Sequence, residues 1–259
     1  MSRPYPLGIS ATPESVAQLK GFFDFIEPPA RVLMGLEDDA AFAPSRDQLL
    51  ASPLPVRAFN VLFPADLKVV GETVNWDRVE SYLDSVINRA AEVGAKVLVF
   101  GSGGARAVPE GFPRTIAWGQ LVRMLSLGAN VAEARGIVFA IEGLRRAECN
   151  IINSFREALQ FARDVDRPGV RVLADIYHFV EENEPLSDIR EGADWLVHVH
   201  LSGAERRYPG YGSYPLRELF DVLDGAGYRG GISIECRWGA DMPAEALYAA
   251  GFLDCMLSG

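Results

Sequence analysis

The sequence predicts a single domain, residues 1–259, folded as a closed (β/α)8 barrel of the TIM type. Two observations predict it. Eight short runs with the composition of buried strands are separated by segments that carry apolar residues at helical spacing, as expected for a parallel sheet covered by helices. The last four runs each end in a carboxylate or an imidazole, at intervals that fit one strand, one helix and two loops.

The strand-like runs follow one another from end to end of the chain. They are Leu7–Ser10, Phe22–Ile26, Val56–Phe63, Lys96–Phe100, Ile137–Ile141, Val170–Ala174, Leu196–Leu201 and Gly231–Ile234. Between the third and the fourth run, an apolar stripe over residues 79–90 predicts a helix, and Gly94 suits its C-cap. Similar stripes over residues 121–132, 155–162 and 216–223 are each followed by glycine or proline.

Alternation of strands and helices alone does not separate a closed barrel from a doubly wound open sheet. Strands that are consecutive in the chain spread apart in an open sheet, whereas in a barrel their carboxyl ends converge on one mouth. Ligand-type residues at the ends of four successive strands therefore favour closure. Segment 28–55, rich in proline, alanine and aspartate, is expected to form a helix and an irregular loop.

Composition and charge narrow the function. The formal net charge is −10, which argues against a nucleic-acid partner and against an anionic membrane surface. No run approaches the ~20 apolar residues of a membrane-spanning helix. The three cysteines are unclustered, so they indicate neither a disulfide framework nor a thiolate metal site, and a reducing cytoplasm is the expected location. A small neutral substrate, or one held through a metal, fits best.

The four strand-end residues form the candidate site. They are Glu142, Asp175, His200 and Glu235, separated by 33, 25 and 35 residues. Three carboxylates and one imidazole make a hard, mostly oxygen site for a divalent cation. Glu142 and Glu235 would flank the barrel mouth, where one carboxylate can remove a proton from a carbon acid and the other can return it. That arrangement suits the isomerisation or epimerisation of a ketose.

The three histidines of the chain fall within one stretch of sequence. His178 follows Asp175 by three residues and could act as a ligand, a proton donor or a substrate hydrogen-bonding group, with a purely structural role as the alternative. His198 is expected to face the helices and to pack there. The glycine-rich loop 101–104 lacks the sequence of a phosphate-binding loop, which favours a tight turn at the rim of the barrel. Arg106, just after it, could reach a substrate carboxylate or phosphate.

Three stretches resemble a known group of enzymes. They are Ala140–Asn153, His200–Gly212 with its Pro209-Gly210-Tyr-Gly212, and the ending Gly227–Glu235. They are similar to the strand 5, strand 7 and strand 8 motifs of the D-tagatose and D-psicose 3-epimerases, within the xylose isomerase-like TIM-barrel superfamily. The stretch from Phe100 to Gly111 fits the wider superfamily, and the likeness is thin before about residue 95.

The resemblance implies a role for each residue of the site. One Mn²⁺, Mg²⁺ or Co²⁺ ion, with Zn²⁺ as a further option, would be held by Glu142, Asp175, His200 and Glu235. Glu142 and Glu235 would also exchange the proton on the substrate carbon through a cis-enediolate. The residues implied to hydrogen-bond substrate oxygens are Glu148, His178 and Arg206. Relatives often assemble as dimers or tetramers, so a homo-oligomer is compatible with the resemblance.

The expected function is a metal-dependent isomerase or epimerase of a sugar or small hydroxyketone. A lyase of the inosose dehydratase type is the first alternative, since the same carboxylates would serve and hydroxide would leave after proton abstraction. A non-catalytic sugar-binding barrel is the second, although pure binding has no need of two carboxylates beside one carbon. An apurinic-site endonuclease is a remote third, because that site requires many histidines and this acidic chain has three.

Overall fold

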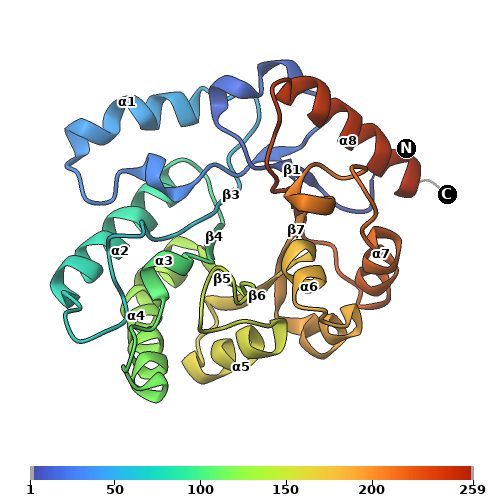
Figure 1. The fold of residues 1–259 in the computed structure, drawn as a ribbon. Coiled ribbons are helices and arrows are strands. Elements are labelled where there is room, and N and C mark those ends of the chain that lie inside the picture. The colour runs from blue at the N-terminus through green and yellow to red at the C-terminus, as the bar shows by residue number, and fades with distance from the viewer. Residues whose placement is uncertain (1–2, 258–259) are drawn as a thin grey trace.

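A computed structural model describes residues 3–257 and confirms the closed barrel of parallel strands (Figure 1). Its strands are β1 (Leu7–Ile9), β2 (Phe25–Ile26), β3 (Ala58–Phe59), β4 (Val97–Phe100), β5 (Val138–Glu142), β6 (Val170–Asp175), β7 (Leu196–Leu201) and β8 (Gly231–Ile234). Neighbouring strands follow the order β2-β1-β8-β7-β6-β5-β4-β3, and every pair is parallel. Each predicted strand-like run therefore overlaps one strand of the barrel.

The gap between β2 and β3 is bridged by single backbone hydrogen bonds. Ile26 N donates to Pro55 O at 2.9 Å, and Asn60 N donates to Pro28 O at 3.1 Å. Isolated parallel bridges pair Ile26 with Val56 and Pro29 with Asn60. The cylinder is therefore nearly closed, and the carboxyl ends of all strands meet at one mouth.

Helices surround the strands as a ring (Figure 1). The α-helices are α1 (Asp39–Leu50), α2 (Trp76–Glu92), α3 (Gly103–Arg106), α4 (Arg114–Arg135), α5 (Phe155–Val165), α6 (Ile176–Glu181), α7 (Leu216–Gly225) and α8 (Met242–Leu257). Local signals fix their ends: Asn75 and Ser154 cap the starts of α2 and α5, and Gly136 ends α4 in the left-handed conformation. Within residues 3–257, none of the helices is both long enough and apolar enough to cross a membrane.

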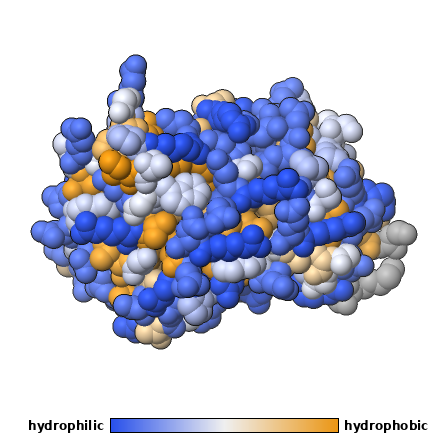
Figure 2. Space-filling model, turned by 90° about the horizontal axis from the view of Figure 1, so that it is seen from below, coloured by the Kyte–Doolittle hydropathy of each residue, from blue (hydrophilic) through white to orange (hydrophobic). Residues whose placement is uncertain are grey.

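The ring of helices turns polar side chains outward. Figure 2 shows that the face on the side of α4 and α5 is mostly hydrophilic, with hydrophobic side chains in small scattered groups. Inside the barrel, large side chains pack against very small ones. A Cβ on Gly8 would lie 2.2 Å from the ring of Phe25, so this phenylalanine fills the space that a larger residue on β1 would need. The interior below the mouth is thus closed by a few large side chains set among very small ones.

The loop after α6 contains a carboxyl group with an altered pKa. Glu184 accepts a hydrogen bond from Phe155 N at the start of α5. Burial raises the pKa of Glu184 from 4.5 to about 7, and the nearby Asp188 carboxylate adds to the rise, whereas the bond from Phe155 N opposes it. The folded protein therefore binds a proton on this group that the unfolded chain releases at lower pH.

We expect the Glu184→Gln variant to lose part of the pH dependence of stability. In the wild type, the contribution of Glu184 to the free energy of unfolding is fully present below about pH 4.5 and falls as the pH rises to about 7. The variant should therefore gain stability relative to the wild type between these values, measured by urea unfolding with EDTA present. Glu191→Gln, an exposed carboxylate in the next segment, is the control. An unchanged difference across this range would contradict the assignment.

Candidate metal centre

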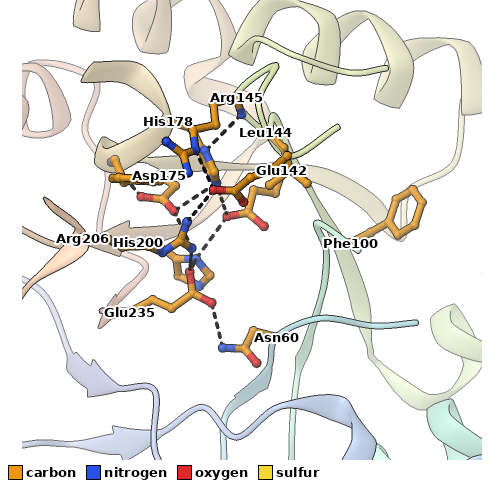
Figure 3. Close-up of polar contacts among 12 residues, drawn as sticks. Asn60, Phe100, Glu142, Leu144, Arg145, Asp175, His178, His200, Arg206 and Glu235 are labelled. Carbon is orange, nitrogen blue, oxygen red and sulfur yellow. Dashed lines mark hydrogen bonds and ion pairs between the residues drawn. The ribbon is translucent and has the colours of Figure 1, made fainter. Parts of the chain in front are cut away.

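The barrel brings the four predicted ligands together at the carboxyl ends of its strands (Figure 3). One ligand atom from each of Glu142, Asp175, His200 and Glu235 lies within 4.8 Å of all the others. His200 Nδ1 is 3.5 Å from Glu142 Oε1 and 3.4 Å from Glu235 Oε2. Four ligand atoms from four neighbouring parts of the barrel thus converge on one point.

The polar atoms that face this point have few partners. Among residues 3–257, no hydrogen-bond partner is found for the buried atoms Glu142 Oε1, Asp175 Oδ2 and His200 Nδ1. Unpaired buried polar atoms are costly, so native proteins seldom leave several of them side by side. A divalent cation would satisfy all three at once, and three carboxylates with one imidazole are suitable donors for Mn²⁺, Mg²⁺ or Co²⁺. The residues present therefore fit a metal ion.

Burial and the crowding of negative charge also shift the pKa values of the cluster. Burial raises the pKa of Asp175 to about 6, although His178 and Arg206 oppose the rise. Burial would lower the pKa of His200, but the carboxylates of Glu27 and Glu235 raise it well above 6.5. A proton on His200 thus offsets part of the crowded negative charge, and a metal ion that binds Nδ1 would take the place of that proton.

A fifth buried carboxylate, Glu27, holds His200 in place from the other side. Glu27 Oε1 lies 2.8 Å from His200 Nε2, and Glu27 Oε2 lies 2.7 Å from His198 Nε2. All three residues are buried. A carboxylate bound to the far nitrogen of a ligand histidine fixes the ring orientation and tautomer and makes the ligand nitrogen more basic. Glu27 is absent from the predicted site, although it follows the strand-like run Phe22–Ile26 as the predicted ligands follow theirs.

The prediction that His198 faces the helices is wrong. Residues two apart on a strand point to the same side of a sheet, so His198 and His200 share the inner face of β7. The register agrees, because His198 pairs with Leu173 and His200 pairs with the ligand Asp175. The role of His198 is therefore polar as well as steric: its ring supports Glu27.

The three residues predicted to contact substrate lie around the four ligands. His178 Nε2 has no hydrogen-bond partner in the described part of the chain and lies 3.6 Å from Asp175 Oδ2, while His178 Nδ1 accepts a hydrogen bond from Arg145 N. Arg206 donates to Glu235 Oε2 at 2.6 Å and lies 3.7 Å from Glu148 Oε1. The structure thus brings Glu148, His178 and Arg206 to the mouth, and their contacts with substrate remain a prediction.

Asn60 is a further polar residue of the mouth that the sequence interpretation missed. Its Nδ2 donates to Glu235 Oε1 at 2.9 Å and to Ser10 Oγ at 2.8 Å. Asn60 directly follows β3, but it lies inside the predicted run Val56–Phe63, so the sequence did not mark it as a strand end. With Arg206 on the other oxygen, both oxygens of Glu235 accept a hydrogen bond, which fixes the direction of this carboxylate (Figure 3).

Arg106 does not face a substrate. It is fully buried and donates to three carbonyl oxygens, those of Phe100 at 2.9 Å, Glu142 at 2.8 Å and Ile152 at 3.1 Å. The prediction that it reaches a substrate carboxylate or phosphate is therefore wrong, because the side chain is fully buried and backbone carbonyls bind both of its terminal nitrogens. Arg106 instead ties the end of β4 to the end of β5, where Glu142 stands.

The glycine-rich loop gives Glu142 the space it needs. A Cβ on Gly101 would lie 2.1 Å from Glu142 Oε2, well inside contact distance. A tight loop at the rim was expected here, and the structure shows the short helix α3 beginning two residues later. Gly101 therefore leaves room for the Glu142 carboxylate.

The fold and this arrangement of ligands define the class. A model for the xylose isomerase-like TIM barrel family matches residues 67–254, and the chain belongs to that family. A D-psicose 3-epimerase from Ruminiclostridium cellulolyticum is 34% identical over 119 residues, 46% of this chain and 41% of that protein. A 3-dehydro-D-guloside 4-epimerase from Escherichia coli K12 is 29% identical over 171 residues, 63% of this chain and 65% of that protein. These alignments span less than two thirds of either relative.

Solved structures match over nearly the whole chain. A 3-keto-D-glucoside 4-epimerase from E. coli superposes with a TM-score of 0.81 at 22% identity, covering 98% of this chain and all of that one. A D-psicose 3-epimerase crystallised in the presence of D-fructose gives the same TM-score at 21% identity and the same coverage. At such identities the likeness is evidence for the fold, and it confirms the barrel.

Removal of one ligand should abolish metal-dependent stability. We expect Mn²⁺ to raise the melting temperature of EDTA-treated wild-type protein, since an ion that binds only the folded state adds about 2.7 kcal/mol at 100 times its Kd. Asp175→Asn should lose most of this increase, because an amide replaces a buried carboxylate. Glu148→Gln, outside the four ligands, should keep it. The measurement is thermal unfolding against Mn²⁺ concentration, and equal shifts in wild type and Asp175→Asn would refute the site.

Removal of the Glu27 carboxylate, which supports His200, should weaken the binding of the metal ion. We expect Glu27→Gln to raise the Kd for Mn²⁺ about 10- to 100-fold, as outer carboxylates of metal-bound histidines usually do. The measurement is calorimetric titration of metal-free protein. Unchanged affinity in a variant that unfolds at the wild-type temperature would contradict this role of Glu27.

Proposed function

We propose that this protein is an isomerase or epimerase of a sugar or small hydroxyketone that depends on one divalent cation. The observation that carries the proposal is the position of Glu142 and Glu235, which approach His200 Nδ1 to 3.5 and 3.4 Å at the same mouth. Two carboxylates so close to one point can remove a proton from a carbon and return it. The similarity to a D-psicose 3-epimerase and to a 3-dehydro-D-guloside 4-epimerase also supports it.

The two glutamates differ in their hydrogen bonds: Asn60 and Arg206 donate to Glu235, whereas Glu142 Oε1 has no partner among residues 3–257. Although burial opposes it, the neighbouring His200 lowers the pKa of Glu142. Although burial opposes it, the neighbouring His200 and Arg206 lower the pKa of Glu235 to about 2, so this carboxylate is ionised in the resting protein. One glutamate would take the proton from the substrate carbon and the other would supply a proton, which leads through a cis-enediolate to the isomer. Glu142 is buried and the Glu235 side chain is only 15% exposed, which would limit the access of bulk water to the exchanging proton.

The remaining groups of the mouth would bind and orient the substrate. A bound divalent cation, Mn²⁺, Mg²⁺ or Co²⁺, would polarise a carbonyl or hydroxyl oxygen and so increase the acidity of the adjacent C–H group. Arg206 points its guanidinium toward Asp175 and Glu235, where it would stabilise negative charge that develops on a substrate oxygen. The unpartnered His178 Nε2 and the carboxylate of Glu148 would hydrogen-bond substrate hydroxyls.

Replacement of either glutamate tests the proton transfer. We expect Glu142→Gln and Glu235→Gln each to lower the rate of isomerisation at least ~100-fold, because an amide cannot accept the proton. Ketoses, aldoses and small hydroxyketones are screened with Mn²⁺ in heavy water, and incorporation of deuterium at the reacting carbon is followed by NMR. Glu148→Gln is the matched control, and it should raise KM more than it lowers kcat.

The same assay separates the alternatives by product. An isomerase conserves the mass of the substrate apart from deuterium, whereas a lyase releases water. A sugar-binding barrel would bind a sugar without exchange. Full activity in both Glu→Gln variants on a verified substrate would refute the proposed mechanism.

A further inference from the structure

A cavity of about 630 Å³ lies at the end of the barrel opposite the candidate metal centre. Its lining includes the first residues of β4 and β8, Val97 and Gly231, together with Leu49 and Leu50 at the end of α1. These positions are the amino ends of the strands, whereas Glu142, Asp175 and Glu235 stand at the carboxyl ends or just beyond them. The volume is within the range of small-molecule binding sites.

Two of the strands that line the cavity begin with small residues. Gly231 carries no side chain, and Ala58 at the start of β3 contributes one methyl group. Part of the wall is apolar, with Phe25, Leu54 and Val56 all buried. Such a wall would hold the apolar body of a ligand by removing it from water.

Polar groups at the cavity lack partners of their own. Ser52 Oγ is buried and, in the described part of the chain, has no hydrogen-bond partner. Arg57 and Lys96 also line the cavity, and between residues 3 and 257 neither side chain makes an ion pair or a hydrogen bond. Lys96 N donates to Arg57 O at 2.8 Å, so the two residues are neighbours at the starts of β3 and β4, and both are exposed.

The charge at this cavity is opposite to that of the protein as a whole. No aspartate or glutamate is among the residues that line it, although the net charge of the chain is −10. The guanidinium of Arg57 lies 5.7 Å from the centre of the Phe25 ring, which directs the charge along the apolar wall. Two cations, a free hydroxyl and apolar walls are the features that would recognise a carboxylate attached to an apolar body.

We propose that this cavity is a second binding site, which takes a small amphipathic carboxylate. The carboxylate would lie against Arg57 and Lys96 at the opening, and the apolar body would extend past Phe25. His198 lines the cavity and lies 2.7 Å from Glu27, whose other oxygen contacts His200. The site does not depend on the proposed catalytic function, since none of the four proposed metal ligands lines it.

Calorimetric titration with 4-phenylbutyrate and with its neutral amide tests the site. Wild-type protein should bind the acid at least about tenfold more tightly than the amide, because a charge-assisted hydrogen bond is worth roughly one decade of affinity. Arg57→Gln and Lys96→Gln should each weaken binding of the acid about tenfold and leave the amide unchanged. Ser52→Phe, which fills the cavity, should weaken both ligands.

Two controls separate this site from others. Arg217→Gln removes an exposed arginine on α7 and should not affect binding, and Asp175→Asn removes a proposed metal ligand and should not either. Equal binding of the acid by wild type, Arg57→Gln and Lys96→Gln would overturn the proposal, as would the absence of binding with a Kd below about 1 mM. Loss of binding in Asp175→Asn would assign the ligand to the metal centre. A dimer that Arg57→Gln dissociates would assign this face to a second copy of the chain.

Discussion

His200 lies between acidic groups on both of its ring nitrogens, and the candidate site depends on this balance of charge. Nδ1 faces Glu142 and Glu235, and Nε2 faces Glu27, with all four side chains largely buried. Ionised carboxylates this crowded are tolerated in an interior only when cations accompany them. Arg206 and a proton on His200 supply part of that charge, and a divalent ion at the unpartnered oxygens would supply the rest.

The fold and the four central residues were predictable because both depend on local patterns. Apolar runs alternate with amphipathic helical segments, as a barrel requires. A carboxylate at the end of a strand lies at the mouth of the barrel regardless of the conformation of the loops. Glu27 and Asn60 stand at strand ends too, but β2 and β3 contain only two residues each, so their ends are poorly marked in the sequence. The partners of Glu27 lie 171 and 173 residues away, and only the closed cylinder brings them together.

The two wrong assignments have a different origin. A solvent-facing role for Arg106 assumed that a charged side chain beside a glycine-rich loop reaches outward, yet carbonyls from 6, 36 and 46 residues away enclose its guanidinium. The sequence carries no signal for backbone acceptors of this kind, because every residue has a carbonyl. His198 was assigned to the face opposite His200, whereas side chains two residues apart on a strand point to the same face.

The arginines at the mouth also bear on the kind of substrate that the site would accept. Arg145 pairs with Glu148 at 2.7 Å and with Glu181 at 3.0 Å, and Arg206 pairs with Glu235 at 2.6 Å. Each guanidinium is thus already matched by carboxylate charge before any ligand binds. A phosphate group would need a surplus of positive charge that these pairs do not leave, whereas the hydroxyls of an uncharged sugar need only hydrogen-bonding groups. Under the proposed function, the charge balance of the mouth therefore suits an unphosphorylated substrate better than a phosphorylated one.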